Sequence, residues 1–128
     1  MAEGTFNITE MGAPIGCYSH ARRIGPFVAV AGMASLDADG KVVGVGDIRA
    51  QTRQTLTLIK AALKTCGATL DDVIKFTVHL TSYDDYDGMN EVFREFFPKA
   101  PPPRATLSAA LILPEFLIEI ETLAVVRG

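Results

Sequence analysis

The sequence contains few cysteines and histidines, and neither type has a spacing typical of a metal site. The residues of these two types are Cys17, Cys66, His20 and His79. No C-x-x-C or H-x-x-x-H pair is present, and no second pair of ligands accompanies Cys17 and His20, so we expect no metal site. Cys66 ends a helical pattern and is expected to pack as a small apolar side chain.

Long apolar runs and a strong excess of one charge are also missing. No apolar run approaches the roughly 18 residues that a membrane-spanning helix needs. The N-terminal residues 1–5 have neither a basic start nor an apolar core, so we expect no signal peptide and a cytoplasmic protein. Fifteen acidic and 12 basic residues give a net charge of −3. This balance argues against a nucleic-acid partner, and the short apolar runs argue against a membrane partner.

The composition is that of a folded protein of modest size. Of the 128 residues, 48% are hydrophobic and 21% are charged, which excludes a disordered chain. The length suits one domain, and no linker, repeat or low-complexity segment divides it. We therefore expect a single domain over residues 1–128.

Hydrophobic spacing predicts two helices and several strands. Asp47 can cap the start of the first helix, and Gly67 follows its end. The strand–helix–strand order around this helix implies a right-handed parallel crossover. The predicted class is α/β, with a mixed sheet and two helices packed on one face. In chain order, the expected elements are a strand at 27–31 that stops at Gly32, an edge strand at 41–45, a helix at 47–66, a strand at 73–80, a helix that begins at Ser82 and ends before Pro98, and strands at 105–113 and 117–126.

The predicted strand at 105–113 poses a packing problem. It is almost entirely apolar, which is typical of a strand covered on both faces. Two helices can cover only one face of the sheet, so another body must cover the other face. Because most soluble oligomers are homo-oligomers, we expect this body to be another copy of the chain.

Arg104 and Glu119 interrupt the apolar pattern of the C-terminal third. Arg104 directly follows a proline run, and its planar guanidinium can hold a carboxylate by two parallel hydrogen bonds. Glu119 and Glu121 share one face of an apolar strand, where burial would raise a carboxyl pKa and suit acid–base chemistry. The alternatives are a surface arginine at a loop end and solvated or structurally paired acids on an edge strand.

Two further polar features admit both structural and functional interpretations. Residues 18–23 combine two hydroxyls, an imidazole and two guanidiniums, but they match no nucleophile motif, and the arginine pair can be a solvated turn. His79 lies on the polar face of its strand, where a packed or interfacial histidine is commoner than a catalytic one.

Blocks of sequence along almost the whole chain resemble the reactive-intermediate deaminases, the Rid or YjgF family of enamine/imine deaminases. The matching blocks, in order, are I-G-C-Y at 15–18, V-A-G at 30–32, Q-T-R-Q-T-L at 51–56, D-D-V-I-K-F-T-V at 71–78, M-N-E-V-F at 89–93, F-F at 96–97, P-R-A at 103–105 and I-E-I-E at 118–121. The resemblance implies a chorismate-mutase-like fold that assembles as a homotrimer, with sites in the clefts between subunits.

The resemblance also implies roles for individual residues. Arg104 matches the arginine that grips the substrate carboxylate, and Glu119 matches the catalytic glutamate. Tyr18 matches a tyrosine that lines the cleft, Gly32 a glycine whose backbone approaches the ligand, and Asn90 an asparagine of the second helix near the site.

The implied reaction is hydrolysis of a small imine or enamine, such as 2-aminoacrylate, to a 2-keto acid and ammonia, without a cofactor. The chain departs from the family pattern at Ala31, Met33 and Thr106, which bears on substrate choice. Alternatives are an aminomuconate-type deaminase and a non-catalytic metabolite-binding or chaperone-like module. A ribonuclease, a label that some relatives carry, is disfavoured by the acidic net charge and by the scarcity of histidine.

Overall fold

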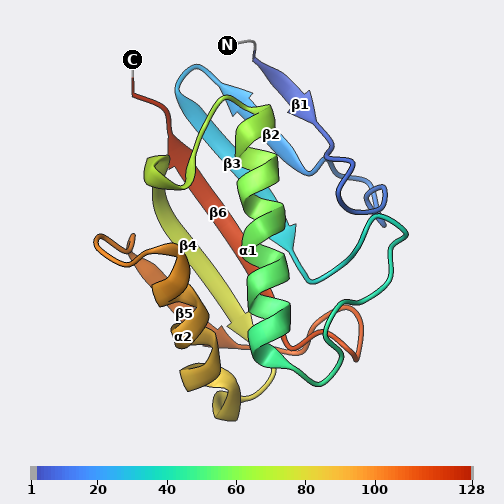
Figure 1. The fold of residues 1–128 in the computed structure, drawn as a ribbon. Coiled ribbons are helices and arrows are strands. Elements are labelled where there is room, and N and C mark those ends of the chain that lie inside the picture. Colours follow the sequence, from blue (N-terminus) through green and yellow to red (C-terminus); the bar gives the residue numbers. More distant parts are fainter. Residues whose placement is uncertain (1–2, 128) are drawn as a thin grey trace.

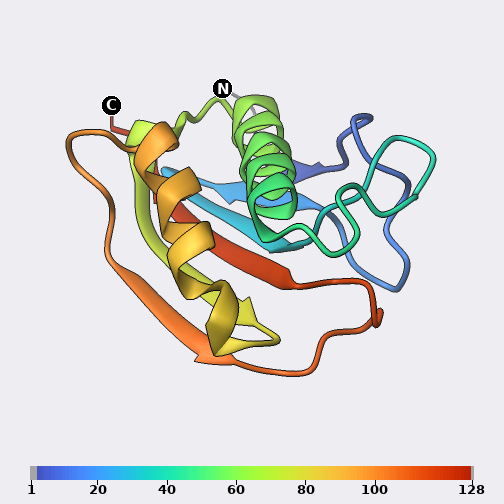
Figure 2. The same cartoon turned by 60° about the horizontal axis from the view of Figure 1, so that its bottom comes forward.

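The computed structural model describes residues 3–127. Met1 and Ala2, which belong to the segment where no signal peptide is expected, lie outside the described residues. In the described chain, six strands form one mixed sheet, and both helices lie on the same face of it (Figures 1 and 2). The elements are β1 (Gly4–Phe6), β2 (Ala21–Ile24), β3 (Phe27–Met33), α1 (Ile48–Thr65), β4 (Val73–Leu80), α2 (Tyr86–Phe96), β5 (Arg104–Ser108) and β6 (Ile118–Val125), with short 3-10 helices at Leu70–Asp72 and Tyr83–Asp85.

The sheet confirms the predicted α/β class and adds an unexpected strand order. Its order is β1-β2-β3-β6-β4-β5, and β6 pairs antiparallel with both β3 and β4. Strands β3 and β4, which flank α1 in sequence, therefore run parallel to each other, as a crossover requires. The last strand of the chain is inserted between them, while β5 pairs parallel with β4 at the sheet edge.

Helix α1 has the ends that its sequence predicts. The Asp47 carboxylate accepts a hydrogen bond from the Ala50 amide at 3.0 Å, which satisfies one of the free donors of the first turn. The helix closes at Cys66, which is fully buried, and Gly67 follows with a φ of 75°. That left-handed conformation favours glycine, so the chain can turn back toward the sheet.

The core fills the space between the helices and the sheet. Phe76 of β4 lies at its centre, with its ring edge-on to Phe93 of α2 at a centroid distance of 5.6 Å. Edge-to-face packing is a favoured arrangement of aromatic rings. Alternate residues of the central strands face the two helices, and these buried residues include Val78, Leu80, Ile118 and Ile120. The buried helix residues that pack against them include Leu56, Ile59, Leu63, Met89 and Val92.

Two predicted strand boundaries are wrong. Strand β3 does not stop at Gly32 but continues to Met33, with a register shift between Val30 and Met33 that accommodates the glycine. The edge strand expected at 41–45 is absent, and a single bridge between Leu36 and Val42 takes its place.

Two further predictions at 82–113 also need correction. Ser82 does not begin α2, since its hydroxyl accepts a hydrogen bond from the Asp84 amide and caps the short 3-10 helix before Tyr86. The apolar run at 105–113 is not one buried strand. Only its first part belongs to β5, an edge strand, and the rest is a loop that leads to β6.

Sequence patterns also missed β1 and β2, which extend the sheet beyond β3. Both are short, and β2 contains the basic pair Arg22–Arg23, which resembles a turn more than a strand. Arg23 is fixed structurally, because its guanidinium donates hydrogen bonds to the carbonyl oxygens of Gly25 and Cys66, each at 2.8 Å.

No helix packs against the second face of the sheet within residues 3–127 (Figure 2). Large apolar side chains are exposed on this open face, among them Phe27 (64% exposed), Leu107 (51%) and Leu123 (49%). None of the helices in the described range is long and apolar enough to cross a membrane. Exposed apolar side chains of this kind are typical of a surface that makes contact with another molecule.

Candidate functional site

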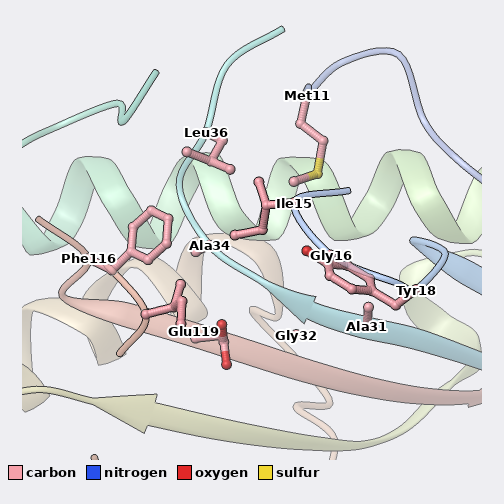
Figure 3. A pocket seen from close by; sticks show the side chains of 11 residues that line it. Met11, Ile15, Gly16, Tyr18, Ala31, Gly32, Ala34, Leu36, Phe116 and Glu119 are labelled. Atoms are coloured by element: carbon pink, nitrogen blue, oxygen red, sulfur yellow. The ribbon is translucent and has the colours of Figure 1, made fainter. Parts of the chain in front are cut away.

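Glu119 reaches into a concave site with a predominantly apolar lining. The pocket, of about 420 Å³, lies where β3, β6, the 11–18 segment and the loop before β6 meet (Figure 3). Tyr18 and Gly32 also line it, as the sequence predicts. The other lining residues are Met11, Ile15, Gly16, Ala31, Ala34, Leu36, Ile112 and Phe116.

Gly32 makes room for the Glu119 carboxylate. A methyl group at position 32 would lie only 3.0 Å from both Cδ and Oε2 of Glu119, which is tighter than most Cβ contacts, so the carboxylate would have to shift. Because β3 pairs with β6, the glycine lies directly beside the acid in the sheet (Figure 3). The glycine at this position therefore lets the carboxylate lie against the β3 backbone at the edge of the pocket.

The surroundings of Glu119 shift its ionisation. Half-burial raises the pKa of the Glu119 carboxyl, since a charged group loses solvation there. The imidazole of His79 lowers the same pKa, and the carboxylate of Glu121 raises it further. The net result is a raised pKa, which is the property expected of a carboxyl group that exchanges protons with a substrate or water.

Gln51 of α1 fixes the loop that forms one wall of the pocket. Its fully buried side-chain amide donates hydrogen bonds to the carbonyl oxygens of Gly44 and Glu115, at 3.1 and 2.9 Å, and its oxygen accepts one from the Leu117 amide at 2.9 Å. These bonds bracket Phe116, which packs into the pocket. Gln51 therefore holds the entrance to β6, two residues before Glu119.

His20 closes the loop that carries Tyr18, because it ties residues 7 and 8 to the start of β2, and it does not line the pocket. Its ring is almost completely buried, and Nδ1 accepts a hydrogen bond from the Ile8 amide at 3.1 Å. The His20 amide in turn donates to the Asn7 side chain at 2.9 Å. Burial lowers the pKa of His20, so the ring favours its neutral form. This histidine is a structural residue.

Arg104 and Asn90 lie together in a second concavity of about 340 Å³, on the α2 side of the sheet. The guanidinium carbon of Arg104 lies 4.9 Å from the centroid of the Phe93 ring, and Nε donates a hydrogen bond to Thr106 Oγ1 at 3.0 Å. A further bond of 3.4 Å joins Nη2 to the Tyr86 hydroxyl, whose pKa is lowered by hydrogen bonds from Asn90 and Arg104. These contacts orient the guanidinium.

Within one chain, Arg104 and Glu119 lie on opposite faces of the sheet. Arg104 is in register with the buried Phe76 and faces α2, whereas Glu119 is opposite His79 on the open face. The structure thus brings Glu119, Gly32 and Tyr18 together and separately brings Arg104 and Asn90 together. A single described chain does not join the two groups in one site.

Sequence patterns missed the apolar wall of the first pocket. Ile15, Ile112 and Phe116 come from two irregular segments, where no periodicity marks them. Among residues 3–127, no three His, Cys, Asp or Glu side chains are grouped so that they could hold a metal ion. The pocket therefore suits a small organic molecule with an apolar part close to a titratable carboxyl group.

Comparison with known proteins gives consistent matches over nearly the whole chain. The family model described as Endoribonuclease L-PSP matches residues 9–126. A RutC family protein from Pyrococcus abyssi is 40% identical over 111 residues, which cover 87% of each chain. The structure of RidA from an Antarctic Psychrobacter is 30% identical, with a TM-score of 0.89 over 96% of this chain and 99% of that one. The structure of Escherichia coli TdcF with bound serine is 27% identical, with a TM-score of 0.89 over 98% and 100%.

Substitution of Gly32 tests the packing of Glu119. We expect Gly32→Ala to fold normally, since Gly32 does not have a positive φ, but to push the flexible carboxylate of Glu119 away from β3. The pKa of Glu119 should then fall toward its ordinary value as the carboxyl becomes more solvated. Carbon-detected NMR of the side-chain carboxyl measures this change. Gly12→Ala is the control, because its new methyl group would make only ordinary contacts with Gly40. If the pKa of Glu119 is the same in Gly32→Ala as in the wild-type protein, Gly32 does not determine how Glu119 packs.

Proposed function

Because the chain belongs to the Endoribonuclease L-PSP family, the Rid/YjgF family, we propose that it is an enamine/imine deaminase. Its substrates would be 2-aminoacrylate-type intermediates, which it would convert to 2-keto acids and ammonia. The observation that carries this proposal is the half-buried Glu119, with its raised pKa, in an apolar pocket beside Gly32. A carboxyl group with a raised pKa is suited both to accept a proton from water and to donate one to the substrate.

The proposed reaction needs only water and one acid–base group. The enamine first tautomerises to an imine, and the oxygen of water then bonds to the imine carbon. Glu119 accepts a proton from that water and delivers it to nitrogen. The product of this step is a carbinolamine, whose hydroxyl proton then passes to nitrogen, again through Glu119. The carbon–nitrogen bond breaks, ammonia leaves, and the carbon–oxygen bond becomes the carbonyl of the 2-keto acid. The substrate supplies the electrophilic carbon, so the protein's role is to orient the substrate and to move protons.

Arg104 supports a substrate with a carboxylate. Its guanidinium is held by the ring of Phe93 and by Thr106, and Nη1 makes no hydrogen bond within residues 3–127. The TdcF structure holds serine, an amino acid with a carboxylate beside its nitrogen. A 2-imino acid presents the same two groups, and the guanidinium can hold its carboxylate by paired hydrogen bonds.

The opposite orientations of Arg104 and Glu119 lead to a proposal about assembly. We propose a homotrimer in which Arg104 and Asn90 of one subunit complete the pocket formed by Glu119, Gly32 and Tyr18 of its neighbour. The exposed apolar side chains of the open face, including Phe27 and Leu123, support association through this face.

Replacing the carboxyl of Glu119 tests its chemical role. Glu119→Gln keeps the shape and much of the hydrogen bonding but cannot exchange the proton, so we expect turnover to fall by roughly 10²–10⁴-fold. The assay generates imines in situ with an amino-acid oxidase and traps the remaining imine with semicarbazide. If the wild-type protein binds imino acids without releasing ammonia, it is a binding module instead. Unchanged turnover in Glu119→Gln would transfer the role to another group.

A conservative change of Arg104 tests the carboxylate clamp. Arg104→Lys keeps the positive charge but loses the planar pair of donors, so it should be nearly as impaired as Arg104→Ala. We expect kcat/KM for 2-imino acids to fall roughly 30- to 1000-fold in both variants. Thermal melts provide the control, because Arg104 is at the start of an edge strand and its loss should leave the core intact. Near-normal kcat/KM in Arg104→Lys would refute the clamp.

Subunit mixing tests whether the site is shared between copies. Arg104→Ala and Glu119→Gln are each expected to be inactive, but a mixed oligomer can pair an intact Arg104 with an intact Glu119 across an interface. Random mixing of equal amounts during refolding should restore about a quarter of wild-type activity. Light scattering should give about three times the chain mass of 13.7 kDa. No recovery despite mixed oligomers would overturn the shared site.

A further inference from the structure

His79 lies between the two carboxylates of the open face. It is directly opposite Glu119 in the antiparallel β4–β6 ladder, and Thr77 is opposite Glu121. The Nε2 atom of His79 is 3.7 Å from Oε2 of Glu121, on the diagonal of the same ladder. Directly opposed and diagonal side chains are the closest neighbours on one face of a sheet. One imidazole is thus placed to interact with both acids.

Packing alone does not account for a histidine at this position. The side chain is only 20% exposed, and its Nδ1 atom is buried without a hydrogen-bond partner in the described chain. A buried polar atom without a partner costs stability, whereas an apolar ring of similar size would not. The unfavourable Nδ1 environment indicates that the imidazole contributes something other than packing.

The charges around His79 indicate what it contributes. Glu119 and Glu121 are two residues apart on the same face, so their charges repel each other. From β5, the residues that face His79 and Thr77 are the apolar Leu107 and Ala105. Lys75, on the same face of β4, is opposite Leu123 and farther along the strand from Glu119. Among the described residues of these strands, His79 is therefore the cationic group best placed to offset both acids.

We propose that His79 is a positioning residue that keeps Glu119 ionised through a carboxylate–imidazolium–carboxylate row. Glu121 stabilises the charged imidazole from one side, and the imidazole stabilises the Glu119 carboxylate from the other. The influence of His79 on the pKa of Glu119 opposes that of burial. In turnover, this proposal rests on the proposed deaminase function, because an ionised Glu119 is the form that can accept a proton from water.

Carbon-detected NMR of the Glu119 carboxyl tests the row directly. His79→Gln removes the positive charge and keeps a polar side chain. The carboxylate then loses its stabilising partner, so the pKa of Glu119 should rise by about one unit. His79→Lys restores a cation and should return the pKa to the wild-type value or below. Lys75→Gln removes a cation from the same strand face and should shift the Glu119 pKa by a few tenths of a unit at most.

Enzyme kinetics provide the second readout. In His79→Gln, the acidic limb of the plot of kcat/KM against pH should move to higher pH by the same amount as the pKa of Glu119. His79→Lys should reverse this change. Thermal melts confirm that the variants are folded.

The two readouts separate failure of this proposal from failure of the deaminase function. If the wild-type protein hydrolyses no imine, the deaminase function fails, but the NMR titration still decides the role of His79. An active enzyme in which His79→Gln leaves the Glu119 pKa unchanged overturns the row alone. An equal shift in Lys75→Gln overturns it too, because the effect would then reflect net charge and not the position of His79.

Discussion

Strand β6 is hydrogen-bonded on both edges, and the alternation of its side chains determines which residues join the core and which lie at the candidate site. Its even-numbered residues from Ile118 to Ala124 are buried under the helices, where they form the middle of the core. Its odd-numbered residues must face the other way, since successive side chains of a strand point to opposite faces. Glu119 and Glu121 are therefore placed on the open face by the same alternation that builds the core. A shift of one residue in the register would bury both carboxylates.

The position of Glu119 along the chain depends on contacts outside β6. Gly32 leaves space for the carboxylate on the β3 side, and Gln51 fixes the loop through which the chain enters β6. His20 binds residues 7 and 8 and so closes the loop that carries Tyr18. Gly32, Gln51 and His20 come from three separate parts of the chain. Together they set where Glu119 and Tyr18 lie.

The regular elements could be predicted from sequence because local signals define them. The span 73–80 alternates cleanly and is strand β4, and Asp47 and Gly67 mark the ends of α1. Strands β1 and β2 could not be predicted, since each has only three or four residues and depends on pairing with a neighbour. The apolar run at 105–113 was misread because a loop that lines a pocket can be as apolar as a buried strand. The spacing of apolar residues within 105–113 does not show which surface they pack against.

The sequence singled out the charged residues of the candidate site, but it did not predict how they are arranged in space. Arg104 and Glu119 stand out because charged side chains interrupt an apolar pattern, and both do line concave surfaces. That they face opposite sides of the sheet follows from the register of β5, β4 and β6, which no single segment reveals. The role of Gln51 was also hidden, because a polar residue on the buried side of an amphipathic helix resembles an imperfection in the pattern.

The bonding of Gln51 has a consequence for how this protein can change over generations. The three groups that it binds, at Gly44, Glu115 and Leu117, are main-chain atoms, which almost every amino acid supplies in the same form, since only proline lacks the N–H needed at position 117. The path of the 109–117 loop is therefore held independently of most of the side chains that the loop carries. Exposed positions such as Ile112 can be exchanged while the backbone stays in place. The pocket wall can thus acquire new shapes and polarities through single substitutions, without loss of the fold that supports it.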